Sequence, residues 1–115
     1  MSLETTVIER LKTDVVALID AGAEVLAALG DAARFLVAEA AELGTDLAET
    51  AIATVKGAIG AASDLAVEAE DAASAAATGA IEAAGEVSDA AKDRVFAAVS
   101  GTVDGVKVVV KSVTA

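Results

Sequence analysis

The chain has 115 residues, 19 of them acidic and 8 basic, so its formal net charge is −11, and it contains no Cys, His, Trp, Tyr or Pro. This length allows one domain. The absence of Cys and His excludes a thiolate nucleophile, a zinc finger and imidazole acid–base catalysis. The acidic balance argues against a nucleic-acid partner, because phosphates require a basic surface.

Targeting signals are not visible in the sequence. Residues 1–10 carry Glu4 and Glu9 and have no apolar run behind a basic start, so no secretory signal is expected. The longest charge-free stretch, residues 72–81, is far shorter than the ~18–20 apolar residues that a membrane span requires. We therefore expect a cytoplasmic protein.

An 11-residue period runs through the apolar positions of the chain. With 31 Ala and no Pro, helix is the expected state nearly everywhere. The series that begins at Val7 is apolar at all ten of its positions, and the series from Leu11 is interrupted only by Ser88. Such a hendecad repeat has ~3.67 residues per turn and predicts right-handed packing of long helices. The alternative, an ordinary amphipathic helix that matches the period by chance, is less favoured over ten repeats.

The first long helix is predicted to pass through two glycines. Gly30 and Gly44 are each followed by a good N-cap residue, which is typical of a helix break and would give a conventional bundle of three or four short helices. The 11-residue phase nevertheless continues through both positions. Both glycines also fall within the apolar stripe, where a missing side chain permits close helix approach. We therefore favour a continuous helix.

Turns are predicted further along the chain. A hairpin turn is most plausible near residues 57–60, close to the midpoint, and a second candidate spans residues 79–85. The predicted fold is accordingly all-α: one repeat domain over residues 1–115, formed by a long amphipathic helix or a helical hairpin that packs in right-handed bundles.

Residues 95–115 form a Val-rich tail with a different charge. Residues 1–91 hold 17 acids and 4 bases, whereas residues 92–115 hold 2 acids and 4 bases. The density of β-branched residues over 101–113 permits a strand. Because the apolar period continues, we predict helix, as part of the same repeat.

Chemistry-bearing motifs are few. Glu68, Glu70 and Asp71 form a carboxylate cluster, but a solvated helix face explains it better than acid–base work or metal binding. Residues 101–105 superficially resemble a calcium loop, yet they lack the run of oxygen ligands and the final bidentate Glu. We expect no catalytic residue, no cofactor, no metal site and no enzyme activity.

The repeat resembles that of the 11-residue amphipathic-helix class: exchangeable apolipoproteins, synucleins, perilipins and, more loosely, bacterial phasins. The local residue pattern that carries the resemblance is clearest at residues 48–58 (Ala-Glu-Thr-Ala-Ile-Ala-Thr-Val-Lys-Gly-Ala) and 101–107 (Gly-Thr-Val-Asp-Gly-Val-Lys). The resemblance rests on periodicity over nearly the whole chain, and it implies a coat protein of a lipid, membrane or polyester-granule surface. The chain departs from the class in its acidic flanks, because an anionic membrane would repel residues 1–91.

Self-association is the favoured function. The middle of the stripe is almost pure Ala, which buries little area against lipid but lets two helix backbones approach closely. We therefore expect a non-enzymatic structural protein that assembles with copies of itself into a helical bundle or filament, with the apolar particle or membrane surface as the alternative partner. The predicted self-association face comprises Val7, Leu11, Leu18, Gly22, Leu29, Ala33, Ala40, Gly44, Ala51, Val55, Ala62, Ala66, Ala73, Ala77, Ala84, Val95, Val99, Val106 and Val110.

Overall fold

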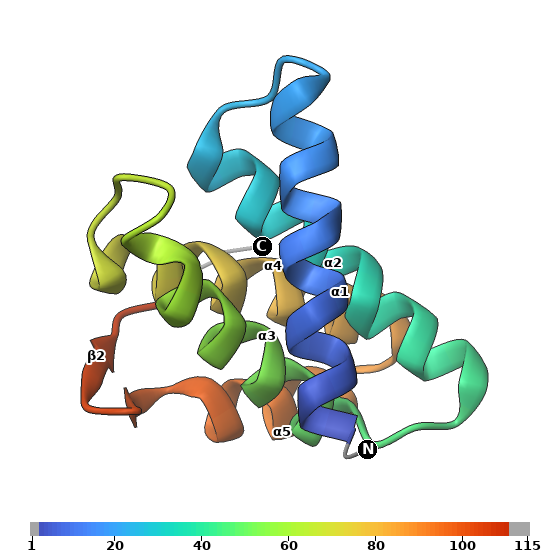
Figure 1. The fold of residues 1–115 in the computed structure, drawn as a ribbon. Coiled ribbons are helices and arrows are strands. Elements are labelled where there is room, and N and C mark those ends of the chain that lie inside the picture. Colours follow the sequence, from blue (N-terminus) through green and yellow to red (C-terminus); the bar gives the residue numbers. More distant parts are fainter. Residues whose placement is uncertain (1–2, 111–115) are drawn as a thin grey trace.

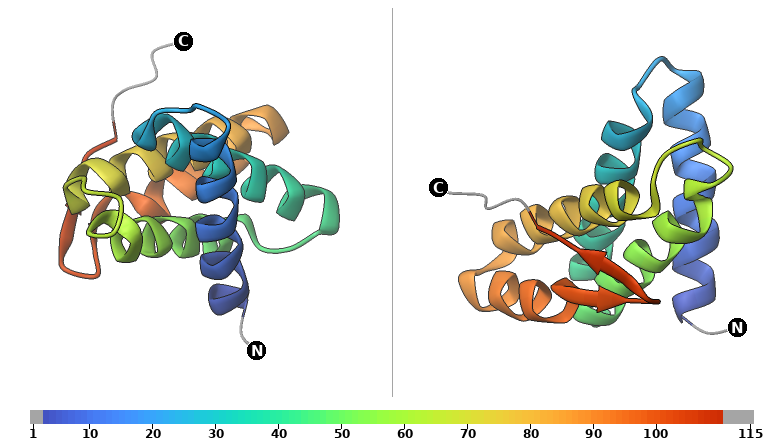
Figure 2. Two further views of the ribbon diagram at one scale, coloured as in Figure 1. Left: turned by 45° about the horizontal axis from the view of Figure 1, so that its top comes forward. Right: turned by 90° about the vertical axis from the view of Figure 1, so that its left-hand side faces the viewer.

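Five helices and one short β-hairpin make up the fold, which a computed structural model describes for residues 3–110. The all-α class is therefore confirmed, with the hairpin as a minor addition. The elements are shown in Figures 1 and 2, and their bounds are α1 Leu3–Asp20, α2 Val25–Leu43, α3 Leu47–Ala62, α4 Ala69–Val87, α5 Asp89–Val99, β1 Gly101–Val103 and β2 Val106–Val108.

The helices pack around α4, which contacts α2, α3 and α5. α1 crosses in front of this layer and packs against α3 and α2 (Figure 1). The two antiparallel strands pair Gly101 with Val108, and β2 lies against α4 (Figure 2). The molecule measures 34 × 27 × 26 Å. A helical hairpin with half of the chain in each arm would be about 86 Å long at ~1.5 Å per residue. The long helix or hairpin that we expected is therefore not the form that the chain takes.

Left-handed residues end the first two helices. Gly22 has φ 106° between α1 and α2, and Gly44 has φ 73° at the end of α2. The Gly44 N–H donates to the carbonyls of Ala40 and Ala41, and Asp46 then caps α3 by accepting from the Glu49 N–H at 3.0 Å. These local hydrogen bonds replace the ones that a continuous helix would make, so the expected passage through Gly44 was wrong. α2 does continue through Gly30, as predicted.

The later breaks lie just beyond the predicted turns. Residues 57–60 are inside α3 and residues 79–85 are inside α4. α3 ends instead before the loop 63–68, in which Ala66 has φ 59°. α4 ends at Val87, and the side chain of the next residue, Ser88, accepts from the Ala91 N–H at 3.0 Å and so caps α5.

The C-terminal tail divides into helix and hairpin. α5 ends at Val99, and the strands follow at 101–103 and 106–108, so the predicted helix over 101–108 was wrong and the strand alternative holds there. The turn between the strands has φ 49° at Asp104 and 80° at Gly105, a left-handed pair that suits a tight hairpin. Residues 111–115 of the predicted tail lie outside the described residues.

Alanine supplies most of the interior. Of the 29 buried apolar residues in the described part of the chain, 17 are alanine, and the largest are leucine and isoleucine. Small side chains let α2 and α4 approach so closely that a Cβ added at Gly79 would stand 2.1 Å from the Gly30 carbonyl oxygen. The close backbone approach predicted for Gly30 therefore occurs, but between two helices of one chain.

Candidate functional site

Most of the predicted self-association face lies in the interior of a single chain. The six members that are not buried are Leu18, Gly22, Gly44, Ala66, Val106 and Val110. The buried members are Val7, Leu11, Leu29, Ala33, Ala40, Ala51, Val55, Ala62, Ala73, Ala77, Ala84, Val95 and Val99. Contacts between chains through the buried members would require the fold to open. The apolar groups on the surface of the closed fold are different residues.

Both aromatic residues of the chain lie at its surface. Phe35 on α2 is 57% exposed and Phe96 on α5 is 48% exposed. Sequence reasoning missed them because it followed the 11-residue series. The i, i+3 and i+4 spacing of apolar residues within α2 alone identifies its buried face, which includes Leu29, Leu36 and Ala40. Phe35 lies outside that face. Among residues 3–110, the other large exposed apolar side chains are Val16, Leu26, Leu43, Val87 and Val109.

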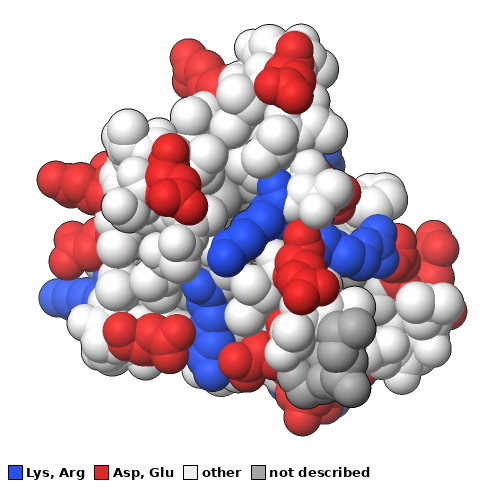
Figure 3. Space-filling view, in the orientation of Figure 1, with Lys and Arg blue, Asp and Glu red and all other residues white. Residues whose placement is uncertain are grey.

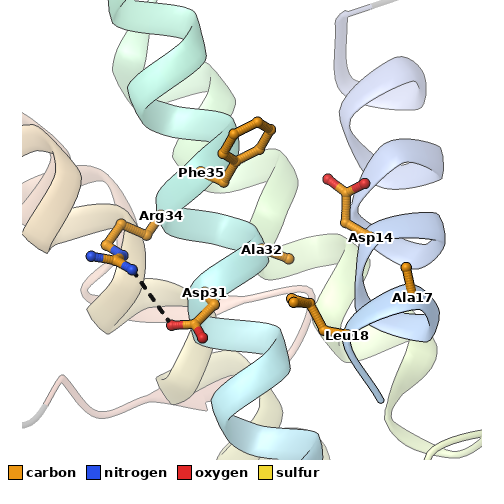
Figure 4. Close-up of a pocket in the computed structure, with 7 residues that line it drawn as sticks. All are labelled: Asp14, Ala17, Leu18, Asp31, Ala32, Arg34 and Phe35. Atoms are coloured by element: carbon orange, nitrogen blue, oxygen red, sulfur yellow. Dashed lines mark ion pairs between the residues drawn. The ribbon is translucent and has the colours of Figure 1, made fainter. Parts of the chain in front are cut away.

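A groove of about 420 Å³ runs between α1 and α2 beside Phe35. Its lining is formed by Asp14, Ala17, Leu18, Asp31, Ala32, Arg34 and Phe35 (Figure 4). The Asp14 carboxylate and the Phe35 ring lie on opposite sides, from α1 and α2 respectively. Arg34 pairs with Asp31 of its own helix at 3.8 Å. The lining of the groove therefore combines charged and apolar side chains.

An ion pair joins the two helices close to the groove. Arg10 of α1 donates to both carboxylate oxygens of Glu39 on α2, and the Nη2–Oε2 distance is 3.1 Å. The hydrogen bond from Arg10 lowers the pKa of the Glu39 carboxyl, and the same bond raises the pKa of Arg10. Since a bidentate pair fixes both distance and orientation, it sets the position of α1 relative to α2.

Removing the Arg10 guanidinium should return the pKa of the Glu39 carboxyl to its ordinary range. In Arg10→Gln we expect the pKa of Glu39 to rise toward 4.5. In the unsubstituted chain the folded pKa is the depressed one, so the pair stabilises above the unfolded pKa and is lost as pH falls through the folded value. Carboxyl NMR titration measures this, with Lys12→Gln as the control on the same helix. An unchanged Glu39 pKa in Arg10→Gln would contradict the assigned cause.

Acidic side chains are spread over the surface, with uncharged areas between them. Figure 3 shows this pattern on the face that α1 crosses. Within residues 3–110 no group of three or more His, Cys, Asp or Glu side chains is placed to hold a metal ion. In the same residues no helix combines the length and the apolar character that crossing a membrane requires.

Comparison with known proteins gives no relative from which a function could be carried over. No protein-family model matches the chain, and no curated protein or solved structure matches it either.

Proposed function

We propose that the chain is a cytoplasmic, non-enzymatic structural protein that associates with copies of itself through exposed apolar side chains, with Phe35 and Phe96 as the anchors. One observation carries the proposal: the only two aromatic residues are at the surface, while the interior is filled largely by alanine. Aromatic side chains bury a large apolar area and so contribute strongly to the energy of an interface. Aromatic residues are also enriched in protein interfaces.

The two anchors occupy different parts of the fold. α2 packs mainly against α4, α1 and α3, whereas α5 packs mainly against α4 and α3. A contact between the Phe35 surface of one copy and the Phe96 surface of the next is heterologous, so it extends into a filament unless the rotation closes a ring. Contact between two Phe35 surfaces would instead give a closed dimer.

The strength of association follows from area and charge. Burying the exposed part of a phenylalanine contributes on the order of 2 kcal/mol at ~25 cal/mol per Å². The net charge of −11 opposes association at low salt. Most of the apolar stripe is buried inside the fold. Two chains could therefore pack through the expected hendecad face only if the fold opened.

Replacing both anchors should abolish association without unfolding the chain. At ~150 mM salt, where charges beyond ~8 Å are screened, sedimentation equilibrium of the unsubstituted chain should give a mass that rises above 11.2 kDa with concentration. The double variant Phe35→Ser, Phe96→Ser should stay at 11.2 kDa with unchanged helicity. Leu43→Ser, at a side chain that is 72% exposed, is the control and should behave like the unsubstituted chain. A monomeric unsubstituted chain, or an associating double variant, would refute the proposal.

A coat on a lipid, membrane or polyester surface is the second candidate. The observation that favours it is the alanine-rich interior, since alanine contributes little burial and makes opening of the fold less costly. An opened chain would present its apolar stripe to such a surface. Flotation with neutral vesicles separates the two candidates: a chain that floats, and that is monomeric when free, acts as a coat.

A further inference from the structure

The groove between α1 and α2 has a floor and a rim of different chemistry. Ala17, Leu18 and Ala32 supply apolar surface between the two helices (Figure 4). Asp14 lies on one side and the Phe35 ring on the other. The groove has a volume of about 420 Å³, which falls in the range of small-molecule sites, ~300–1,000 Å³.

The Asp14 carboxylate lacks a compensating donor. Its Oδ2 atom is shielded from solvent and accepts no hydrogen bond from any residue between 3 and 110. A carboxylate oxygen in this position has lost hydrogen bonds to water and gained none from the protein, which is unfavourable. Arg10 interacts electrostatically with Asp14, but its hydrogen bonds go to Glu39. Asp14 also lines the groove, so a cation bound there would offset a carboxylate charge that the fold leaves without a full set of hydrogen-bond donors.

The remaining groups favour a cation over an anion. The Arg34 guanidinium is next to Asp31 at 3.8 Å, so these two charges offset each other and Asp14 leaves the groove negative. The face of an aromatic ring such as Phe35 also attracts cations. The net charge of −11 raises the local concentration of cations around the whole molecule.

We propose that this groove binds a small organic cation, in which a primary ammonium group is joined to a short apolar chain. The ammonium pairs with Asp14 beside the Phe35 ring, and the apolar chain lies on Ala17, Leu18 and Ala32. The groove shares Phe35 with the proposed association surface, so cation binding and association compete for that ring, whereas Asp14 belongs to the groove alone.

Binding of n-hexylammonium, followed by amide NMR titration of the full chain at ~150 mM salt, tests the assignment. The experiment is done below the concentration at which the chain associates. The amide shifts should concentrate around the groove residues of α1 and α2. Hexan-1-ol, of matched length but uncharged, should bind at least tenfold more weakly, since a hydrogen bond to a charged group is worth a factor of about ten or more.

Asp14→Asn keeps the size of the side chain and removes its charge. This variant should weaken hexylammonium binding about tenfold or more, whereas Asp20→Asn, at an exposed carboxylate on α1 outside the groove, should leave it unchanged. The NMR spectrum of each variant shows directly whether it is folded. Equal binding of hexylammonium and hexanol, full affinity in folded Asp14→Asn, or shifts spread over the acidic surface would each overturn the proposal.

Discussion

Replacing Gly79 with alanine should lower the free energy of unfolding by about 1–3 kcal/mol, the usual cost of overpacking a close-packed interior. The added Cβ would stand 2.1 Å from the Gly30 carbonyl oxygen and 2.9 Å from its carbonyl carbon. Both are backbone atoms of α2, so no side chain can rotate away. The two helices would have to move apart along the most extensive helix contact in the fold.

Gly60→Ala is the matched control for this substitution, because it makes the same chemical change inside a helix. Gly60 lies exposed in α3, and a Cβ added there meets nothing within 4 Å. Alanine should therefore stabilise the chain there by about 0.5–1 kcal/mol, through helix propensity alone. Thermal and urea unfolding of both variants shows whether each substitution lowers or raises the free energy of unfolding. A Gly79→Ala chain as stable as the unsubstituted one would show that α2 and α4 do not cross at these glycines.

Leu11→Ala should cost about 2–5 kcal/mol, as is usual for deleting a fully buried leucine. Leu11 is completely buried on α1, where it lies against α3 at Gly57. Its loss leaves a cavity between the two helices. Leu43→Ala removes the same atoms from a side chain that is 72% exposed and should change stability by less than about 0.5 kcal/mol.

The cavity should couple Leu11 to Gly57. A Cβ at Gly57 would stand 2.9 Å from the Cδ2 atom of Leu11, whose side chain is fully buried, so moving Leu11 should offset the ~0.5–1 kcal/mol that Gly57→Ala gains from helix propensity. In the Leu11→Ala background that obstacle is absent, and the same change should cost less. A double-mutant cycle measures the difference. Additive effects at the two positions would contradict the packing of α1 on α3 described above.

The helical class was predictable from the residues, because abundant Ala and the absence of Pro favour helix regardless of tertiary context. The lengths of the helices were not. The middle of the 11-residue series consists of alanine, which is accepted both inside and outside a protein, so the series could not separate the two environments. The 11-residue period groups Ala53 with the acidic residues Glu42 and Asp64, yet Ala53 is only 1% exposed, whereas Ala66 of the predicted face is exposed in a loop.

The candidate site could not be predicted from the sequence for a related reason. Its chemistry depends on Asp14 and Phe35, which lie on different helices and meet only because the chain reverses at Gly22. A continuous helix would keep them about 30 Å apart at ~1.5 Å per residue. The glycine that permits the reversal was assigned to the apolar stripe. Local capping and turn energies, rather than the apolar period, therefore decide which side chains come together.

Amide hydrogen exchange at increasing protein concentration tests most directly how the chain uses its two kinds of apolar residue. Most of the stripe lies inside each chain, and the proposed association contacts are at the exposed phenylalanines. Amides near Leu11 and Ala77 should therefore be protected equally at all concentrations, and protection around Phe35 and Phe96 should rise with concentration. Protection that rises with concentration along the buried stripe, and not at the phenylalanines, would show that the chains assemble through the stripe and would contradict this account.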